Sequence, residues 1–336
     1  MENKRDNTKI RFGVVGTSNI VNKVIEGARL DSRFELVAVY SRTQEKADEF
    51  AARHGIPHTF TSLDTMAASP LIDAVYIASP NSLHADQSIL CMQHGKHVLC
   101  EKPFASNTRE VKDMITTARK NNVVLMEAMK PTLTPNFLSI KNNIDKIGKA
   151  RRYFSCYCQY SSRYDDLKDG IIQNAFKPEL SNGALVDIGV YTIYPMVVLF
   201  GKPELINAVG TKLSTEVDGQ GAVNFGYHGM EATILYSKIA DSALPTEIQG
   251  EEGTITADRI NIINNVSLKR RNGEESIISS PNTMHEYYYE IAEFIDLILG
   301  GKYESAINSH QNSLITMEIL DEIRKQLGVV YPADSI

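Results

Sequence analysis

Residues 10–20 read IRFGVVGTSNI, an apolar run that reaches a glycine and continues into small polar residues. The run predicts a buried strand over residues 10–15, and the apolar spacing that follows predicts a helix over residues 20–30. A glycine at the junction lets the backbone turn tightly and approach a phosphate at the start of that helix. The segment therefore favours a nucleotide-binding α/β fold, although a plain strand-to-helix turn would show the same pattern.

The same alternation of short apolar runs and helical patterns continues to about residue 126. Strands are expected at 34–40, 73–78, 97–100 and 123–126, and helices at 44–53, 83–93 and 110–120. Helix ends are marked by Thr43 and Thr108 as N-caps and by Gly55 and Gly95 as C-caps. Strands that alternate with helices pair in parallel, so residues 1–130 are predicted to be an NAD(P)-binding Rossmann domain with a doubly wound parallel sheet.

The pattern changes after Pro131, where longer alternating stretches at 151–160 and 222–227 predict antiparallel strands. Turn signals stand at 218–219, 250–253 and 272–273, and helices are expected at 136–147, 182–200, 287–299 and 313–327. Residues 131–336 are therefore predicted to be an α+β domain with an open, mainly antiparallel sheet and helices on one side.

Composition limits the class of protein. The 336 residues are 43% hydrophobic and 23% charged, which is typical of globular proteins. Residues 1–9 lack the pattern of a leader peptide, and no stretch of about 20 apolar residues suggests a membrane span, so a cytoplasmic location is expected. The net charge of −6 and the absence of a long basic block argue against nucleic acid. The expected partner is a small-molecule substrate.

Four cysteines are too few for a disulfide framework. Cys156 and Cys158 share one face of an expected strand, which favours buried thiols over a metal site. No metal is therefore expected.

The residues at the first turn and at the end of the second strand define a candidate cofactor site. Only Gly16 matches the glycine pattern of dinucleotide-binding turns, because Ser18 and Val21 occupy the other two glycine positions. The cofactor contacts expected here come from Gly13, Gly16, Thr17, Ser18, Asn19 and Ile20. Where NAD enzymes carry an acidic residue, this chain has Ser41 and Arg42, with Lys46 one turn on, and a guanidinium pairs well with a 2′-phosphate. NADP is favoured, NAD remains possible, and a solvated Arg42 is the alternative.

Two further segments leave strands at the edge where open α/β sheets bind ligands. Ser79, Pro80 and Asn81 follow one strand, and Asn81 is expected to bond the nicotinamide ribose. His84 begins the next helix and is a further cofactor candidate, with a polar surface position as the alternative. Glu101, Lys102 and Pro103 follow the next strand, with Pro103 fixing the turn, Lys102 at the edge of the nicotinamide site and Glu101 orienting the lysine or the ribose.

These motifs, together with residues 126–128 (MEA) and 182–191 (NGALVDIGVY), resemble the family of glucose-fructose oxidoreductase, inositol dehydrogenase and rhizopine-catabolism proteins (Gfo/Idh/MocA). The resemblance covers essentially the whole chain. Tyr191, where many relatives have histidine, is similar to the branch with dimeric dihydrodiol and D-xylose dehydrogenases. The resemblance implies an NAD(P)-dependent oxidoreductase acting on a sugar, a polyol or a related cyclic alcohol or ketone. It also implies that residues 131–336 bind the substrate and form the contacts of a homodimer or homotetramer.

Asp187 and Tyr191 are four residues apart and would project from one face of a helix. Oxidation of an alcohol requires a group that takes its proton, and Tyr191 is the candidate. The Lys102 ammonium is expected to lower the pKa of Tyr191 and to stabilise the alkoxide, while Asp187 orients the lysine or the substrate hydroxyl. The alternative is that Tyr191 is a core aromatic of the helix.

Two arginines usual in that branch, one after residue 128 and one before Pro178, are absent here, so the substrate pocket differs. Arg163 is proposed to bind substrate with Lys102, Asp187 and Tyr191, and Lys130, Tyr164 and Lys177 are further candidates, with surface positions as the alternative. Two other functions stay open. One is a non-catalytic regulatory protein that senses a nucleotide or sugar, and the other is a glycosidase that uses NAD transiently.

Overall fold

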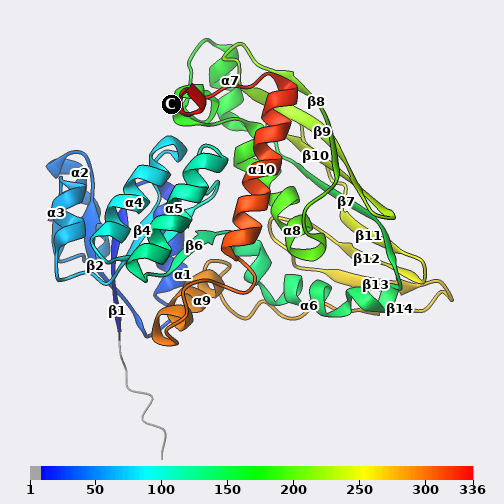
Figure 1. Ribbon diagram of the computed structural model, residues 1–336, viewed down its shortest axis with the longest axis horizontal. Helices are drawn as coiled ribbons and strands as arrows, with labels where there is room; N and C mark the ends of the chain where they lie inside the picture. Colours follow the sequence, from blue (N-terminus) through cyan, green and yellow to red (C-terminus); the bar gives the residue numbers. More distant parts are fainter. Residues whose placement is uncertain (1–8, 336) are drawn as a thin grey trace, which may run out of the picture.

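The computed structural model describes residues 9–335, which form two sheets covered by helices (Figure 1). The first sheet is wholly parallel, in the order β3-β2-β1-β4-β5-β6. Its strands are β1 (Ile10–Val15), β2 (Phe34–Tyr40), β3 (His58–Phe60), β4 (Ala74–Ile77), β5 (His97–Glu101) and β6 (Leu125–Ala128). This order confirms the predicted Rossmann sheet. The strand β3, with only three residues, was not predicted because it is too short to show a period.

Helices cover both faces of this sheet. Their bounds are α1 (Asn19–Ala28), α2 (Gln44–His54), α3 (Leu63–Ala68), α4 (His84–Gln93) and α5 (Thr108–Asn121). Apolar residues of α3, α4 and α5 join one buried cluster, and those of α1 and α2 join another on the opposite face. Thr43 caps α2 as predicted, since its side chain accepts from the Lys46 N–H. The predicted cap Thr108 is wrong, because Asn107 accepts the Glu110 N–H and caps α5.

The second sheet has the order β14-β13-β12-β11-β7-β10-β9-β8. Its strands are β7 (Ala150–Cys158), β8 (Leu205–Lys212), β9 (Asp218–Tyr227), β10 (Met230–Ser237), β11 (Thr246–Gly250), β12 (Gly253–Ala257), β13 (Val266–Arg270) and β14 (Glu275–Ile277). Every neighbouring pair is antiparallel except β7 and β10, which are joined by a long crossover. The turn predicted at 218–219 is wrong, because those residues begin β9.

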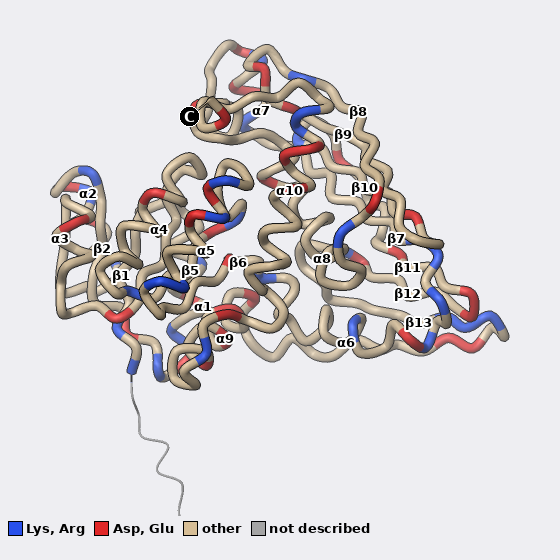
Figure 2. Tube along the Cα trace, viewed as in Figure 1, with Lys and Arg blue, Asp and Glu red and all other residues tan. Residues whose placement is uncertain are grey.

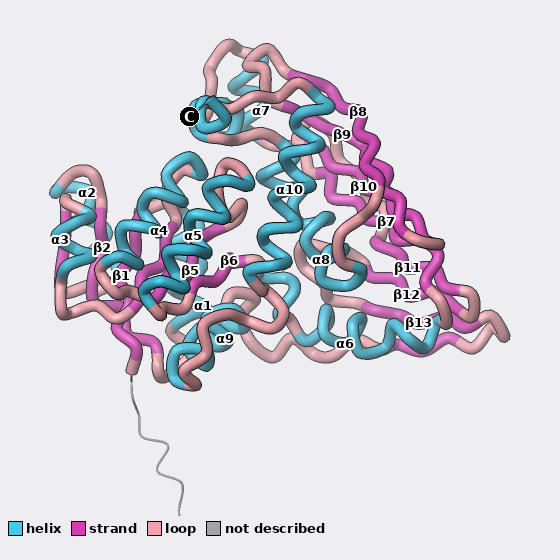
Figure 3. The backbone as a smooth tube through the Cα atoms, viewed as in Figure 1, coloured by secondary structure: helices cyan, strands magenta, loops and turns pink. Residues whose placement is uncertain are grey.

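Apart from α9 (Tyr288–Leu299), the remaining helices lie on one side of the second sheet (Figure 3). They are α6 (Pro135–Asn143), α7 (Ser162–Lys168), α8 (Val190–Phe200) and α10 (His310–Leu327). Helix α9 returns to the first domain, where Phe294 packs 5.9 Å from the Phe12 ring of β1. The Rossmann unit is therefore completed by a segment from the C-terminal part of the chain.

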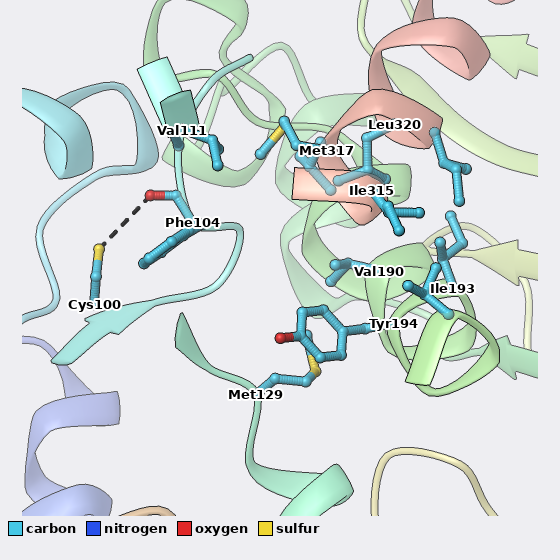
Figure 4. Close-up of a cluster of buried hydrophobic side chains, with 14 of the residues drawn as sticks. Cys100, Phe104, Val111, Met129, Val190, Ile193, Tyr194, Ile315, Met317 and Leu320 are labelled. Atoms are coloured by element: carbon cyan, nitrogen blue, oxygen red, sulfur yellow. Dashed lines mark hydrogen bonds between the residues drawn. The ribbon is translucent and has the colours of Figure 1, made fainter. Parts of the chain in front are cut away.

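Between the two sheets lies a shared hydrophobic core. Figure 4 shows side chains from the first domain, among them Phe104 and Met129, facing Tyr194 of α8 and Met317 of α10. Of the two cysteines predicted to be buried, Cys156 is buried and Cys158 is only half-buried, and Cys91 and Cys100 are buried as well. In the view of Figure 2, basic and acidic residues are interspersed over both domains.

One segment is long and apolar enough to cross a membrane, which the sequence analysis did not expect. An 18-residue window within Pro178–Phe200 has a mean hydropathy of 1.7, and 72% of that window is buried inside the protein. The segment includes α8, which packs against β7 and β10. Burial in the core of the second domain accounts for its apolar composition.

Candidate active site

The loops that carry the predicted site residues meet at one edge of the first sheet. Strands β1, β4 and β5 are neighbours, so the residues that follow them, 16–19, 79–81 and 102–103, lie side by side at the carboxyl ends. The segment around Asp187 in the second domain faces the same edge, because Lys102 bonds to it. The candidate site therefore forms between the two domains.

Lys102 and Asp187 form the centre of the site. The Lys102 Nζ donates to the Asp187 main-chain oxygen at 2.8 Å and to its carboxylate Oδ1 at 3.0 Å. The other carboxylate oxygen, Oδ2, accepts from the Nζ of Lys238. An ammonium has three donors, and Asp187 takes two of those of Lys102, which leaves one for a ligand oxygen. The site thus holds one carboxylate between two lysines.

The charges of Lys102 and Asp187 stabilise each other. Burial alone would lower the pKa of Lys102, but the Asp187 and Glu101 carboxylates more than offset that effect, and the pKa is raised. Burial likewise opposes ionisation of Asp187, but Lys102 and Lys238 hold its pKa well below the usual range. Lys102 is therefore an ammonium at neutral pH and acts first as a donor.

Tyr191 lies beside Lys102 with its ring, not its hydroxyl, towards the ammonium. The Lys102 Nζ is 5.0 Å from the ring centroid, and the Tyr157 ring packs edge-on at 5.8 Å. Burial, followed by the Glu101 carboxylate, raises the pKa of Tyr191 well above its ordinary value. The expectation that Lys102 lowers this pKa is therefore wrong, because the ammonium is paired with Asp187 and meets the ring. Tyr191 is a neutral phenol.

The segment that carries Asp187 and Tyr191 is less regular than predicted. Residues Leu185–Gly189 form a turn of π-helix, and the α-helix α8 starts at Val190. The buried Asp218 carboxylate accepts the Leu185 N–H at 2.6 Å and fixes the start of the turn. Both predicted side chains nevertheless reach Lys102, so the spacing of four residues correctly brought them together.

Glu101 contacts the main chain of Lys102. Its carboxylate accepts the Tyr76 hydroxyl and, at 3.2 Å, the Lys102 main-chain N–H. Burial raises the pKa of Glu101, with Lys102 acting in the opposite sense. Its side chain thus holds the main chain of Lys102, and its predicted role in orienting the lysine or the ribose stays a prediction. The Lys102–Pro103 peptide bond is cis.

His84 is the first residue of α4, but it is not on the surface. Its ring is 1% exposed, and the two ring nitrogens face the main-chain oxygens of Pro103 at 2.8 Å and Ser79 at 3.0 Å. The predicted cofactor contact is therefore not supported, because neither nitrogen is left for a ligand. His84 instead ties together the two loops that carry the site.

The start of α1 fits a phosphate. Gly16 has φ +111°, and a Cβ there would lie 2.7 Å from the Ala78 main-chain oxygen, so the turn requires glycine. Ser18 precedes α1 without a side-chain capping bond, and the first turn contains no acidic residue. The N–H groups at Asn19 and Ile20 are thus available to an anion, and Thr17 lies in the same turn. Gly13 is placed elsewhere, inside β1 against Met66, and its predicted cofactor contact is not supported.

The loop after β4 contains one buried polar atom that could bind a ligand. The Ser79 Oγ is buried and has no hydrogen-bond partner among residues 9–335. Asn81 donates to the Ser181 main-chain oxygen at 2.9 Å and to the Asn182 side chain at 3.0 Å. In this structure Asn81 therefore links the two domains, beside Pro80.

At the end of β2, Ser41 is buried, and its N–H donates to the Phe60 main-chain oxygen at 3.1 Å. Arg42 is exposed and lines a cavity that also reaches the second domain. The Lys46 side chain is exposed on α2. This end of the site offers cations and no carboxylate at the position that follows β2, which fits a phosphorylated ribose.

Two of the proposed pocket residues lie outside the group around Lys102. The Arg163 side chain is exposed on α7, and its backbone N–H bonds to Ser161. Lys130 is buried, and its Nζ pairs with Glu286 and lies 4.6 Å from the Tyr287 ring centroid. Neither contacts Lys102 or Asp187.

Lys238 was missed by the sequence analysis. It follows directly after β10, which is parallel to β7, and only that pairing brings its Nζ to Asp187. The feature of the sequence that could have indicated Lys238 is its position directly after an apolar strand. Tyr157, on β7, was missed for the same reason.

Comparison with known proteins also divides the chain into a Rossmann domain and a C-terminal domain. Residues 10–129 match the model of the oxidoreductase family with an NAD-binding Rossmann fold (GFO/IDH/MocA), and residues 143–256 match its C-terminal domain. The chain is 53% identical to the scyllo-inositol 2-dehydrogenase (NADP⁺) IolU of Bacillus subtilis, over 97% of this chain and 99% of that protein. It is 32% identical to the trans-1,2-dihydrobenzene-1,2-diol dehydrogenase of Danio rerio, over 97% and 99%. The crystal structure of aldose-aldose oxidoreductase from Caulobacter crescentus has the same fold, with a TM-score of 0.85 at 20% identity over 95% and 98%.

Proposed function

Because the chain belongs to the GFO/IDH/MocA oxidoreductase family, whose N-terminal domain is an NAD-binding Rossmann fold, we propose that it is an NADP(H)-dependent dehydrogenase of a cyclic polyol, with an inositol as substrate. As a family member it is an NAD(P)-dependent enzyme that acts on CH–OH groups. The Bacillus subtilis relative, named for scyllo-inositol and NADP⁺, supports both the substrate class and the cofactor. Arg42, in place of the usual acidic residue, supports NADP from this chain itself.

The observation that carries the proposal is the Lys102–Asp187 contact across the domain boundary at the carboxyl ends of β4 and β5. The contact orients the Lys102 ammonium and leaves one of its N–H donors free. A substrate oxygen placed on that donor would lie at the edge where Rossmann folds hold the nicotinamide. When bound, the nicotinamide accepts or supplies the hydride.

Lys102 is proposed to move the proton. For ketone reduction its ammonium donates a proton to the carbonyl oxygen, and Asp187 and Lys238 hold the lysine in place. For alcohol oxidation the same nitrogen must be neutral to accept the hydroxyl proton, so oxidation should become faster as the pH rises. Tyr191, as a neutral phenol, is proposed to donate a hydrogen bond to the substrate oxygen and not to act as the base.

Lysine at this position also weighs against a purely regulatory protein. Sensing a nucleotide needs no buried ammonium aligned by a carboxylate, and aligning one requires the desolvation of both charges. A glycosidase with the same fold would also use bound NAD, but it would show no net reduction of added cofactor.

A panel of substrates tests the proposal. Purified protein would be given inositol isomers, aldoses and a trans-dihydrodiol with NADP⁺ or NAD⁺, and formation of the reduced cofactor would be followed by absorbance. We expect turnover of an inositol with NADP⁺, and loss of turnover in Lys102→Ala while NADPH still binds. Nucleotide binding without turnover of any compound would favour the regulatory protein instead. Hydrolysis of a glycoside without net cofactor reduction would favour the glycosidase.

A further inference from the structure

A cavity of about 630 Å³ lies between the two domains, beside the end of β2. Arg42 and Pro80 line it from the first domain. Its other wall comes from the second domain, where it is lined by Ile172, Asn174, Lys177, Pro178, Glu179, Leu180, Ser214 and Thr215. The volume is within the range of small-ligand sites. Because Arg42 follows the second Rossmann strand, this is the end of the cofactor site at which the adenosine ribose is recognised.

The cavity holds two cations without partners. Neither the Arg42 guanidinium nor the Lys177 ammonium forms an ion pair or a side-chain hydrogen bond within residues 9–335. Lys177 is half-buried, and Arg42 is exposed. Paired basic side chains are common elsewhere, for example Arg151 with Glu251. Two unpaired cations from two domains that face one cavity point to an anionic ligand.

Other groups of the cavity wall bear on this ligand. The Thr215 Oγ1 is buried and has no hydrogen-bond partner in the described part of the chain, so it is a donor in need of an acceptor. Glu179 is the one acidic residue of the wall, and it is exposed. Its carboxylate would repel an anion, but the two cations leave the wall with a net positive charge.

We infer that Lys177 and Thr215 of the second domain complete the binding site for the 2′-phosphate of NADP(H), which Arg42 begins from the first domain. The inference rests on the proposed NADP(H)-dependent function. A 2′-phosphate carries up to two negative charges and three strong acceptor oxygens, enough for a guanidinium, an ammonium and a hydroxyl together. The phosphate then ties the two domains together, and NAD(H), which lacks it, does not.

The test measures binding and not turnover. Dissociation constants of NADPH, NADH, 2′,5′-ADP and 5′-ADP would be measured by calorimetry for the wild type, Lys177→Gln and Lys177→Arg. In Lys177→Gln we expect about tenfold weaker binding of the two 2′-phosphorylated ligands and less than twofold change for the other two. Lys177→Arg keeps the cation and should keep the preference. Lys269→Gln, at an exposed position of β13, removes the same charge from the same domain and should change none of the four constants.

The outcomes separate this inference from the function on which it rests. If the wild type prefers the 2′-phosphorylated ligands but Lys177→Gln leaves that preference unchanged, the role of Lys177 is overturned and the NADP preference stands. Equal weakening of all four ligands would also overturn the role of Lys177, because it would indicate a general disturbance of the domain boundary. If the wild type shows no preference for a 2′-phosphate, the proposed cofactor fails, and this inference fails with it.

Discussion

The Lys102 Nζ lies 3.0 Å from the Asp187 carboxylate, although the two residues are 85 positions apart and belong to different domains. Asp187 is shared with Lys238, so the carboxylate is held from both sides. The contact makes the position of the Lys102 nitrogen depend on how the two domains meet. It also raises the pKa of Lys102, and on the proposed mechanism that pKa governs the pH dependence of each direction of the reaction.

Replacement of Asp187 by asparagine tests the control of that charge. The carboxylate raises the pKa of Lys102 against the effect of burial, so Asp187→Asn should lower it. The pH profile of alcohol oxidation, which on the proposed mechanism needs neutral Lys102, should then shift to lower pH. Rate profiles of kcat for wild type and Asp187→Asn would show the shift. A profile that stays in place, or that moves to higher pH, would contradict the assignment of this pH dependence to the ionisation of Lys102.

Tyr191→Phe separates a hydrogen-bond donor from a base. The ring contact with Lys102 survives the change, and only the hydroxyl is lost. We expect kcat to fall by about tenfold, in keeping with one lost hydrogen bond, while the alkaline limb of the oxidation profile stays in place. The measurement is kcat against pH for both proteins. Loss of that limb in Tyr191→Phe would show that the tyrosine is the titrating base.

His84→Ala should weaken the structure of the site without removing a ligand contact. Burial lowers the pKa of His84, so its neutral ring donates to one of the two main-chain oxygens of Ser79 and Pro103. The change leaves that buried oxygen without a donor, at a cost of about 1–3 kcal/mol in the free energy of unfolding. Cofactor affinity should fall as well, because the two loops are no longer tied together. Urea unfolding and NADPH titration would measure both. A variant with wild-type stability would show that the ring is not a structural tie.

The Glu127 carboxyl should make stability depend on pH. One of its oxygens accepts the Phe104 N–H at 3.0 Å, the other has no partner among residues 9–335, and burial raises its pKa to about 8. The folded protein thus holds this proton more tightly than the unfolded chain, in which the pKa is near 4.5. Its stabilising contribution is complete below the unfolded value and is lost as the pH rises towards 8.

The variant Glu127→Gln, which cannot ionise, removes this dependence. Relative to wild type it should gain about 1–3 kcal/mol in the free energy of unfolding between pH 5 and pH 8. Urea unfolding of both proteins at the two pH values gives the difference directly. A difference that is constant with pH would mean that Glu127 does not titrate in this range.

Much of the fold could be predicted from the sequence because its signals are local. Alternating strands and helices up to residue 126 carry their own periods, and the turns at 250–253 and 272–273 fall between strands as expected. The parallel pairing of β7 with β10 has no local signal, since it depends on a crossover of more than 50 residues. The position of Lys238 beside Asp187 follows from that pairing and was missed with it.

In the candidate site, too, local signals could be predicted from the sequence and long-range contacts could not. Spacing alone placed Asp187 and Tyr191 near each other, and the turn after β5 placed Lys102 at the sheet edge. The protonation of Tyr191 could not be predicted, because it depends on which part of the tyrosine the ammonium meets. The burial of His84 could not be predicted because it depends on the loop at Pro103, which is 19 residues away in the sequence.

A pre-steady-state measurement tests the proposed proton transfer between Lys102 and the reacting oxygen. Wild type and Lys102→Met, each saturated with NADP⁺, would be mixed with excess scyllo-inositol, and formation of NADPH in the first turnover would be followed by absorbance. We expect the first turnover to be at least about 100-fold slower in Lys102→Met, while the dissociation constant of NADPH changes less than about threefold. A first turnover within about threefold of wild type would contradict the proposed proton transfer.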